Sequence, residues 1–123
     1  MSVDKTDGQV LKGLLDTLVL GVLAEEDDYG FGILQKLSER AGESLSLKEA
    51  TLYPLLHRME SRGFLECYWR PGQRGTDRKY YRITDDGHAH LSERLVEWKK
   101  VASILETVVL ERRRPESVKK GRK

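Results

Sequence analysis

The sequence predicts a mostly helical protein with one small β-hairpin. Hydrophobic residues recur at the three- and four-residue spacing of a helix in four separate segments of the chain. Between the third and the fourth segment the period changes to two, as it does in paired strands, and Pro71, Gly72 and Gly75 separate two alternating runs. A length of 123 residues suits one ordinary domain of this kind.

The composition argues against secreted and membrane proteins. A single cysteine, Cys67, cannot form an internal disulfide, so a reducing, cytoplasmic location is expected. The longest apolar-rich stretch, residues 10–24, is interrupted by Lys12 and Asp16, and the polar first residues lack the pattern of a signal peptide. No membrane segment or membrane partner is expected.

Residues 10–24 are predicted to form a first helix that is largely buried. Its apolar face is wide and comprises Leu11, Leu14, Leu15, Leu18, Val22 and Leu23. The acidic segment 25–28 breaks the helix, and four acids at a helix end are expected to form a solvated loop. A second amphipathic helix follows, and Gly42 offers its stop. Its apolar residues are Ile33, Leu34 and Leu37.

A third helix is predicted in the stretch ATLYPLLHRMESRGFL, residues 50–65. Its buried stripe has helical spacing and comprises Leu52, Leu55, Leu56 and Met59. Two starts are compatible with the sequence: Ser46 with Glu49 makes a capping box, or Thr51 caps the helix and moves Pro54 into its first turn. The rest of the helix surface is small, hydrogen-bonding or basic, and it comprises Lys48, Thr51, Tyr53, Pro54, His57, Arg58 and Ser61. Such a face is either simply solvated or made for a partner.

Two strands of a hairpin are predicted after Gly63. In the first, Leu65, Cys67 and Trp69 alternate with Glu66, Tyr68 and Arg70; in the second, Lys79, Tyr81 and Ile83 alternate with Arg78, Tyr80 and Arg82. The connecting loop carries Arg74 and is flanked by further basic residues, so the hairpin has a basic tip. Cys67 falls on the apolar face, which favours a buried, inert thiol over a redox sensor.

Thr84, followed by two aspartates, is predicted to cap a last helix that runs to about Arg113, roughly 45 Å long. Its apolar seam has a period of 3.5 and comprises Leu91, Leu95, Trp98, Ala102, Leu105 and Val109. Part of this seam can pack on the domain's own core, but further apolar residues widen it more than a lone helix leaves exposed. A second copy of the chain is therefore the expected partner.

Charge is distributed unevenly along the chain. Residues 1–47 hold four basic and nine acidic residues, whereas residues 48–82 hold eight basic and four acidic ones. Residues 83–123 hold ten basic and seven acidic residues, and their last part, residues 114–123, is expected to be a basic disordered tail. The positive charge thus begins where the third helix begins.

Three helices, a hairpin with a basic tip and a long helix describe a winged helix-turn-helix domain at residues 1–83, followed by a C-terminal dimerisation helix at residues 84–113. In a helix-turn-helix the second helix of the pair enters the major groove of DNA, which is about 12 Å wide, while the preceding helix braces it. Its outer face must then be hydrogen-bonding, basic and unobstructed. The third helix has such a face, and basic residues on the hairpin suit phosphates or the minor groove.

The sequence also resembles the PadR family of bacterial winged-helix transcription regulators, in its short subfamily with one C-terminal helix. The resemblance covers residues 11–105 and is carried by the stretches LKGLLDTLVLGVL, DYGFGILQKL, LSLKEATLYPLLHRMESRGFLECYW, RKYYRITDDGHAHL and EWKKVASIL. The chain departs from the usual pattern at Ala50, where members often have glycine, and at Gly32, where an acidic residue is usual. The resemblance implies a homodimeric repressor that binds a palindromic operator and is released by a small-molecule or stress signal.

The same resemblance implies specific sites. DNA contacts carry over to Lys48, Thr51, Tyr53 and Arg58 on the third helix and to Arg74, Arg78, Lys79 and Tyr80 on the hairpin. Tyr80 is equally compatible with a place in the core. In drug-responsive members a tryptophan of the last helix lines a pocket at the dimer centre, where flat aromatic compounds stack, which implies an effector site at Trp98 and Ala102. A well-packed interface tryptophan is the alternative.

Other functions find less support in the residues. His88 and His90 lie on different sides of a helix and have no nearby cysteine or well-placed acid, so no metal or other cofactor is expected. No enzymatic motif stands out. The alternative to a repressor is a winged-helix module that binds proteins and no operator. The basic faces of the third helix and the hairpin favour double-stranded DNA, with the chain's own promoter as the first target to test.

Overall fold

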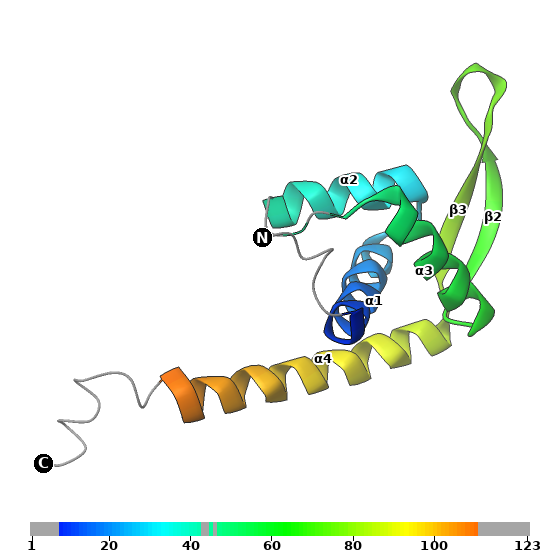
Figure 1. Ribbon diagram of the computed structural model, residues 1–123. Coiled ribbons are helices and arrows are strands. Elements are labelled where there is room, and N and C mark those ends of the chain that lie inside the picture. The colour runs from blue at the N-terminus through cyan, green and yellow to red at the C-terminus, as the bar shows by residue number, and fades with distance from the viewer. Residues whose placement is uncertain (1–7, 43–44, 46, 111–123) are drawn as a thin grey trace, which may run out of the picture. The chain divides into compact units, whose positions relative to one another are not determined.

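The computed structural model describes residues 8–42, 45 and 47–110, with side chains from residue 13 onward except that of Arg74. The elements in chain order are α1 (Gly8–Glu25), β1 (Asp28–Tyr29), α2 (Gly30–Ala41), α3 (Glu49–Ser61), β2 (Leu65–Pro71), the 3-10 turn η3 (Gln73–Gly75), β3 (Asp77–Ile83), α4 (Asp85–Leu105) and the π-helical turn η4 (Glu106–Leu110) (Figure 1). Two compact units, Met1–Leu91 and Ser92–Lys123, make up the chain. The predicted fold, mostly helical with a small hairpin, is confirmed.

The core of the first unit lies among α1, α2, α3 and the inner face of the sheet. From α1 it takes Leu15, Val19, Leu20, Val22 and Leu23, and from α3 it takes Leu52, Leu55, Leu56 and Met59. The buried stripe predicted for the third helix is thus confirmed. Because α3 buries one stripe only, its opposite face stays available to solvent or to a partner.

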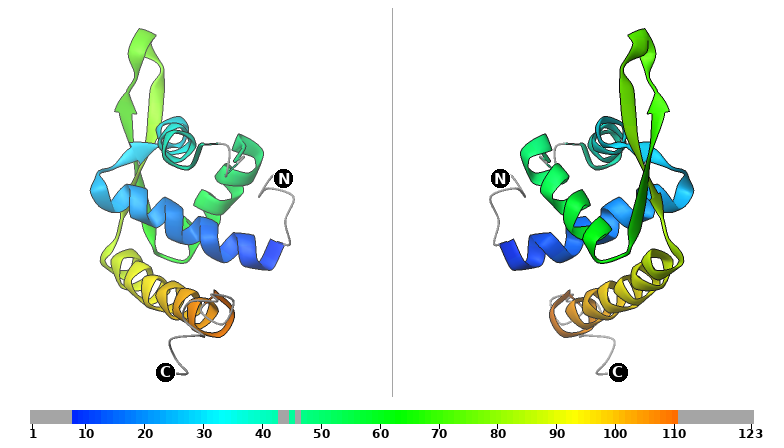
Figure 2. Two further views of the ribbon diagram at one scale, coloured as in Figure 1. Left: turned by 90° about the vertical axis from the view of Figure 1, so that its left-hand side faces the viewer. Right: turned by 90° about the vertical axis from the view of Figure 1, so that its right-hand side faces the viewer.

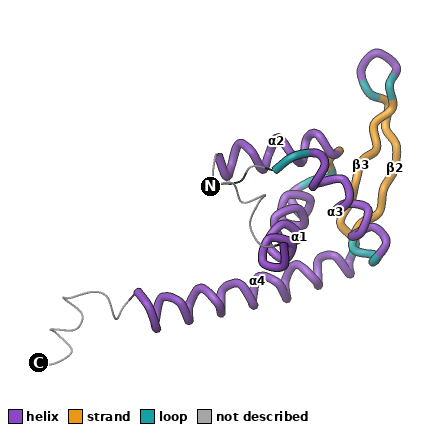
Figure 3. The backbone as a smooth tube through the Cα atoms, in the orientation of Figure 1, coloured by secondary structure: helices purple, strands orange, loops and turns teal. Residues whose placement is uncertain are grey.

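The hairpin of β2 and β3 extends beyond the three helices that gather beside its base (Figure 2). Its strands pair antiparallel from Leu65 with Ile83 to Pro71 with Asp77, and η3 forms the tip (Figure 3). The sequence did not predict β1, a third strand that pairs with β3 and gives the sheet order β1-β3-β2. Two residues are too few to show an alternating pattern, so only the tertiary pairing reveals this strand.

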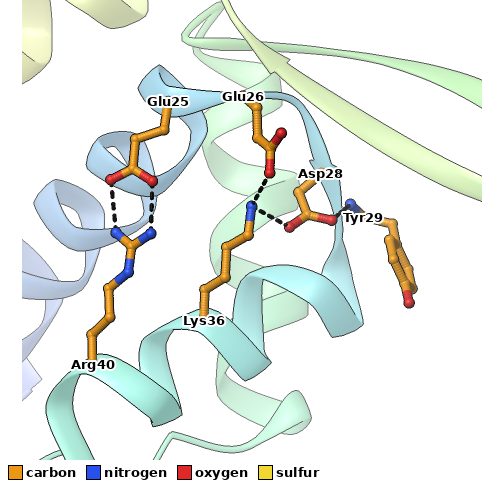
Figure 4. Close-up of polar contacts among 6 residues, drawn as sticks. All are labelled: Glu25, Glu26, Asp28, Tyr29, Lys36 and Arg40. Atoms are coloured by element: carbon orange, nitrogen blue, oxygen red, sulfur yellow. Dashed lines mark hydrogen bonds and ion pairs between the residues drawn. The ribbon is translucent and has the colours of Figure 1, made fainter.

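The acidic segment 25–28 is solvated only in part, because Glu25 and Glu26 are exposed as expected whereas Asp27 is half-buried. Asp28 is buried, and Lys36 of α2 donates to Glu26 at 2.8 Å and lies 3.0 Å from the Asp28 carboxylate (Figure 4). Arg40 of α2 makes two hydrogen bonds of 2.7 Å to Glu25. The expectation failed for Asp28 because α2 returns its basic side chains to the acidic segment, in contacts between residues eight to fifteen positions apart.

The third helix begins differently from both predicted starts. Lys48 occupies the cap position, and its carbonyl accepts from the amides of Thr51 and Leu52 at 3.0 Å. The predicted capping box is therefore wrong, since Glu49 is the first helical residue; Ser46 itself lies outside the described residues. Pro54 lies in the second turn rather than the first, where it leaves one helical carbonyl without its usual donor.

The predicted start of the last helix is confirmed. The Thr84 hydroxyl accepts from the amide of Gly87 at 3.0 Å, and Asp85 and Asp86 follow in the first turn. The α-helix ends at Leu105 and continues as the π-helical turn η4, while residues 111–113 of the predicted helix and the predicted tail at 114–123 lie outside the described residues. Among the described helices, none combines the length and the apolar character that a bilayer span requires.

Candidate nucleic-acid interface

The outward face of α3 is polar and open, as the sequence predicted. Five of the residues predicted for this face are exposed, and they are Lys48, Tyr53, Pro54, His57 and Ser61. Thr51 and Arg58 are half-buried, and both line a hollow of about 200 Å³. The complete lining of this hollow is Leu15, Ala50, Thr51, Pro54, Leu55 and Arg58. The face therefore combines hydrogen-bonding groups at two depths, which suits the uneven floor of a DNA groove.

Tyr53 is positioned by the first turn of α2. A Cβ atom on Gly30 would lie 2.5 Å from Cε1 and from the hydroxyl oxygen of Tyr53, so the ring rests against bare backbone. Partial burial, and then the charge of Glu49, raises the pKa of the Tyr53 hydroxyl, which stays a protonated donor at neutral pH. Only glycine at position 30 allows this placement, which links the two helices of the helix-turn-helix.

Three tyrosines form a row across the outer face of the sheet. Tyr29, Tyr80 and Tyr68 stand on neighbouring strands in direct register, with ring centroids 5.5 Å and 5.8 Å apart. The Tyr68 hydroxyl donates to Asp27 at 2.5 Å, which ties β2 to the segment before β1. We call these three residues the tyrosine row. Tyr80 is therefore half-buried within this row, on the sheet face opposite the core.

Arginines of the hairpin lie over the tyrosine row. The guanidinium carbon of Arg70 is 4.7 Å from the ring centroid of Tyr80, and that of Arg78 is 4.5 Å from that of Tyr29. Arg82 lies over Tyr68 at 5.0 Å but also pairs with Glu66 at 3.0 Å. Among the described residues, Arg70 and Arg78 have no carboxylate within salt-bridge distance, so their charge is available to an anionic partner.

Lys79 and Cys67 lie on the opposite face of the hairpin and reach α3. The Cys67 thiol donates to Glu60 at 3.0 Å, and the Lys79 ammonium lies 3.5 Å from the same carboxylate. The bond to Glu60, together with burial, raises the pKa of the Cys67 thiol, which keeps the half-buried sulfur protonated and unreactive. Lys79, a predicted DNA contact, is thus partly neutralised within the protein.

The second unit presents apolar side chains that the described residues leave uncovered. The exposed ones are Leu95, Val96, Val101, Ile104, Leu105, Val108, Val109 and Leu110. Leu91, the first residue of the predicted seam, packs instead against the core of the first unit, and Trp98 is half-buried. His90 stacks on Phe64 with ring centroids 4.3 Å apart, and within the described part of the chain no three potential ligands converge as a metal site.

The structure places the predicted DNA contacts on α3 and on both faces of the hairpin. Thr51 and Arg58 line one hollow on α3, whereas Tyr53 lies on the other side of the helix against Gly30 of α2; the side chain of Arg74 lies outside the described residues. Sequence reasoning missed Tyr29, which supports Arg78, because it lies far from the hairpin in the chain. It also assigned no role to Trp69, although this side chain is 63% exposed.

Known proteins share both the sequence pattern and the fold. The family described as "Transcriptional regulator PadR-like family" matches residues 19–93. An uncharacterized protein X of Lysinibacillus sphaericus is 41% identical over 97 residues, which are 79% of this chain and 89% of that protein.

Solved structures extend the similarity. A transcriptional regulator from Clostridium thermocellum is 31% identical, with 83% of this chain and 99% of that chain covered and a TM-score of 0.74. A PadR-like transcriptional regulator from Bacillus cereus is 32% identical, with 83% and 97% covered and a TM-score of 0.72. A PadR family transcription regulator from Clostridium difficile is 34% identical, with 76% and 95% covered and a TM-score of 0.68.

Proposed function

Because the chain belongs to the PadR-like family of transcriptional regulators, we propose that it is a homodimeric repressor that binds a palindromic operator, its own promoter region included. The observation that carries the proposal is the open, hydrogen-bonding and basic face of α3 beside a basic hairpin. One such face reads one half-site, and a two-fold dimer reads two.

The proposed DNA contacts divide by depth on the protein surface. Thr51 and Arg58, which line the hollow of α3, are assigned to base edges, and Tyr53, on the other side of the helix, is assigned to the groove wall. Lys48 at the helix start and Arg78 on the hairpin are assigned to phosphates. Arg74 at the hairpin tip, Lys79 and Tyr80 complete the set expected from the family resemblance.

The uncovered apolar side chains of the second unit support the proposed dimer. Eight large hydrophobic residues between positions 95 and 110 are more than 40% exposed, although an apolar surface of this extent is usually covered. A second copy of the same helix is the simplest cover, because a two-fold axis places identical apolar faces together. Residues 84–113 are accordingly proposed as the dimerisation helix.

The signal that releases the operator is proposed to act on the same helix. Trp98 is half-buried and is followed one turn later by the small Ala102, a combination that leaves room for a flat ring between two copies. A planar aromatic effector would thereby change the spacing of the two DNA-binding units.

The proposal is tested by fluorescence anisotropy with a labelled duplex of about 30 base pairs from the region upstream of the chain's own gene. Saturable binding is expected at one dimer per duplex, together with competition by unlabelled promoter DNA well above that by scrambled DNA. Sedimentation of the free protein measures the dimer. If neither promoter nor scrambled DNA binds at low salt, the alternative of a winged-helix protein-binding module takes the place of the repressor.

A further inference from the structure

Trp69 is the large aromatic side chain of the hairpin that the fold leaves most exposed. Its side chain is 63% exposed, whereas Leu65 and Tyr81 on the same face of the sheet are buried. Among the described residues, its indole has neither a hydrogen bond nor a ring partner. The fold itself therefore makes little use of the largest side chain in the hairpin.

Strand register places Trp69 on the side of the hairpin that faces α3. Trp69 pairs with Lys79, and paired residues of antiparallel strands point to the same face. Lys79 reaches Glu60 of α3 at 3.5 Å, and Cys67, two residues before Trp69, donates to the same carboxylate. Trp69 lies two register pairs nearer the tip of the hairpin than Cys67. It thus lies on the α3-facing side of the hairpin, nearer the tip than Cys67.

The geometry of duplex DNA determines which part of a bound duplex would lie against this side of the hairpin. The major and minor grooves are separated by one sugar-phosphate strand, and they are about 12 Å and 6 Å wide. If α3 lies in the major groove and the hairpin tip reaches the adjacent minor groove, the strand between these grooves runs between α3 and the hairpin. An exposed side chain on the α3-facing side of the hairpin then meets that strand.

We propose that Trp69 binds the sugar-phosphate strand that passes between α3 and the hairpin. The indole matches this partner in two ways: its ring offers an apolar surface to deoxyribose, and its only polar group is a donor, whereas phosphate oxygens only accept. The pairing of Lys79 with Glu60 removes one free positive charge from this face, so a neutral donor with a large apolar ring suits the position. This inference rests on the proposed DNA-binding function and assigns it a contact outside the predicted set.

The test uses the two tryptophans of the chain, Trp69 and Trp98. In a Trp98→Phe protein all tryptophan emission comes from Trp69, and acrylamide quenching measures its accessibility with and without the 30-base-pair promoter duplex. The Stern-Volmer slope is expected to fall at least about two-fold on DNA binding. The matched control is Trp69→Phe, in which Trp98 alone emits and the slope is expected to stay unchanged.

The affinities of Trp69 variants for the promoter duplex provide a second test. Trp69→Ala removes ring and donor and is expected to weaken promoter binding about 10-fold or more, while Trp69→Phe loses only the donor and should fall between this variant and the wild type. Because Trp69 is largely exposed, both variants are expected to keep the circular dichroism spectrum of the wild type.

The outcomes separate this inference from the proposed function. If the wild type binds the duplex while Trp69 remains as quenchable as in the free protein, or if Trp69→Ala binds like the wild type, the assignment of Trp69 is overturned and the repressor stands. If the wild type binds no DNA, both are overturned.

Discussion

At the scale of single residues, Arg58 and Arg78 are both basic but stand in different surroundings. Arg58 lines the hollow on α3, whereas Arg78 lies over the ring of Tyr29 on the outer sheet face. We expect Arg58→Ala to cost about 1–3 kcal/mol at one base pair of the operator and to change sequence preference, because a base-edge contact is lost. Arg78→Ala should weaken the binding of all duplexes alike, because a contact to phosphate carries no sequence information. Titration of the operator and its single-base variants measures both, and unchanged affinity in both variants would move the DNA face elsewhere.

Glu60 provides a pH-dependent contribution to stability. The hydrogen bond from Cys67 lowers the pKa of the Glu60 carboxyl. Burial raises this pKa, and the charge of Lys79 lowers it further. Because the pKa of Glu60 is lower in the folded protein, its ionised carboxylate stabilises the fold at pH values above its ordinary pKa of 4.5. This stabilisation is lost as the pH falls below that value. We expect Glu60→Gln to cost less than about 1 kcal/mol at pH 7 and nothing in strong acid. Urea unfolding across pH checks this, with exposed Glu93→Gln as control; a constant difference at all pH values would contradict it.

Substitution of Trp98 tests whether this residue lines an effector site or only packs in the proposed dimer interface. If it lines a pocket between two copies, planar lipophilic aromatic compounds should quench its emission in a Trp69→Phe protein and lower the affinity for the operator. Stacking on an indole contributes about 0.5–1.5 kcal/mol per aromatic pair, so Trp98→Ala should abolish the response and leave a dimer. An unresponsive wild type, or a monomeric Trp98→Ala protein, would make Trp98 an interface residue only.

At the scale of elements, two helical glycines predict opposite effects of the same substitution. A Cβ at Gly21 in α1 meets no atom within 4 Å, so Gly21→Ala should raise the free energy of unfolding by about 0.5–1 kcal/mol through helix propensity. A Cβ at Gly87 in α4 would overlap the carbonyl oxygen of Phe64, which already accepts from the amide of Thr84 at 3.0 Å. Gly87→Ala should therefore lower the free energy of unfolding by about 1–3 kcal/mol. Denaturant unfolding compares the two, and a common sign would refute the packing argument.

The end of the last helix changes which side chains belong to its apolar face. In the π-helical turn Glu106–Leu110 hydrogen bonds run from residue i to i+5, so Leu110, rather than Val109 alone, follows Leu105 along the helix surface. Both side chains are more than 40% exposed. The proposed dimer face thus includes Leu110, which the 3.5-residue seam did not contain.

At the scale of the whole molecule, DNA binding should depend strongly on salt although the net charge is only +2. The basic groups are concentrated after residue 47, and each phosphate contact releases a counterion on binding. With about six contacts per dimer, the logarithm of the affinity should fall against the logarithm of salt concentration with a slope near −5. Anisotropy titrations at several salt concentrations measure it. Specific binding with a slope shallower than about −2 would contradict the proposed footprint, and half-sites should lie about one or two helical turns apart.

The sequence by itself determined the features that arise from short-range physics. Apolar periodicity identified α1, α2, α3 and the last helix, alternation identified the hairpin, and Thr84 with its two aspartates located a helix start. The face of α3 opposite the buried stripe was also predictable, because a helix repeats every 3.6 residues. The choice of Thr51, Tyr53 and Arg58 as DNA contacts came from the family resemblance and not from that repeat.

The tertiary structure decided everything that depends on segments far apart in the chain. It created β1, whose Tyr29 supports Arg78 across the sheet, and it returned Lys36 and Arg40 of α2 to the acids that end α1. It also started α3 after Lys48 and left Trp69 exposed beside that helix. Ring stacking, ion pairing and the pairing of β1 with β3 join residues that have no fixed separation in sequence, so no local pattern encodes them.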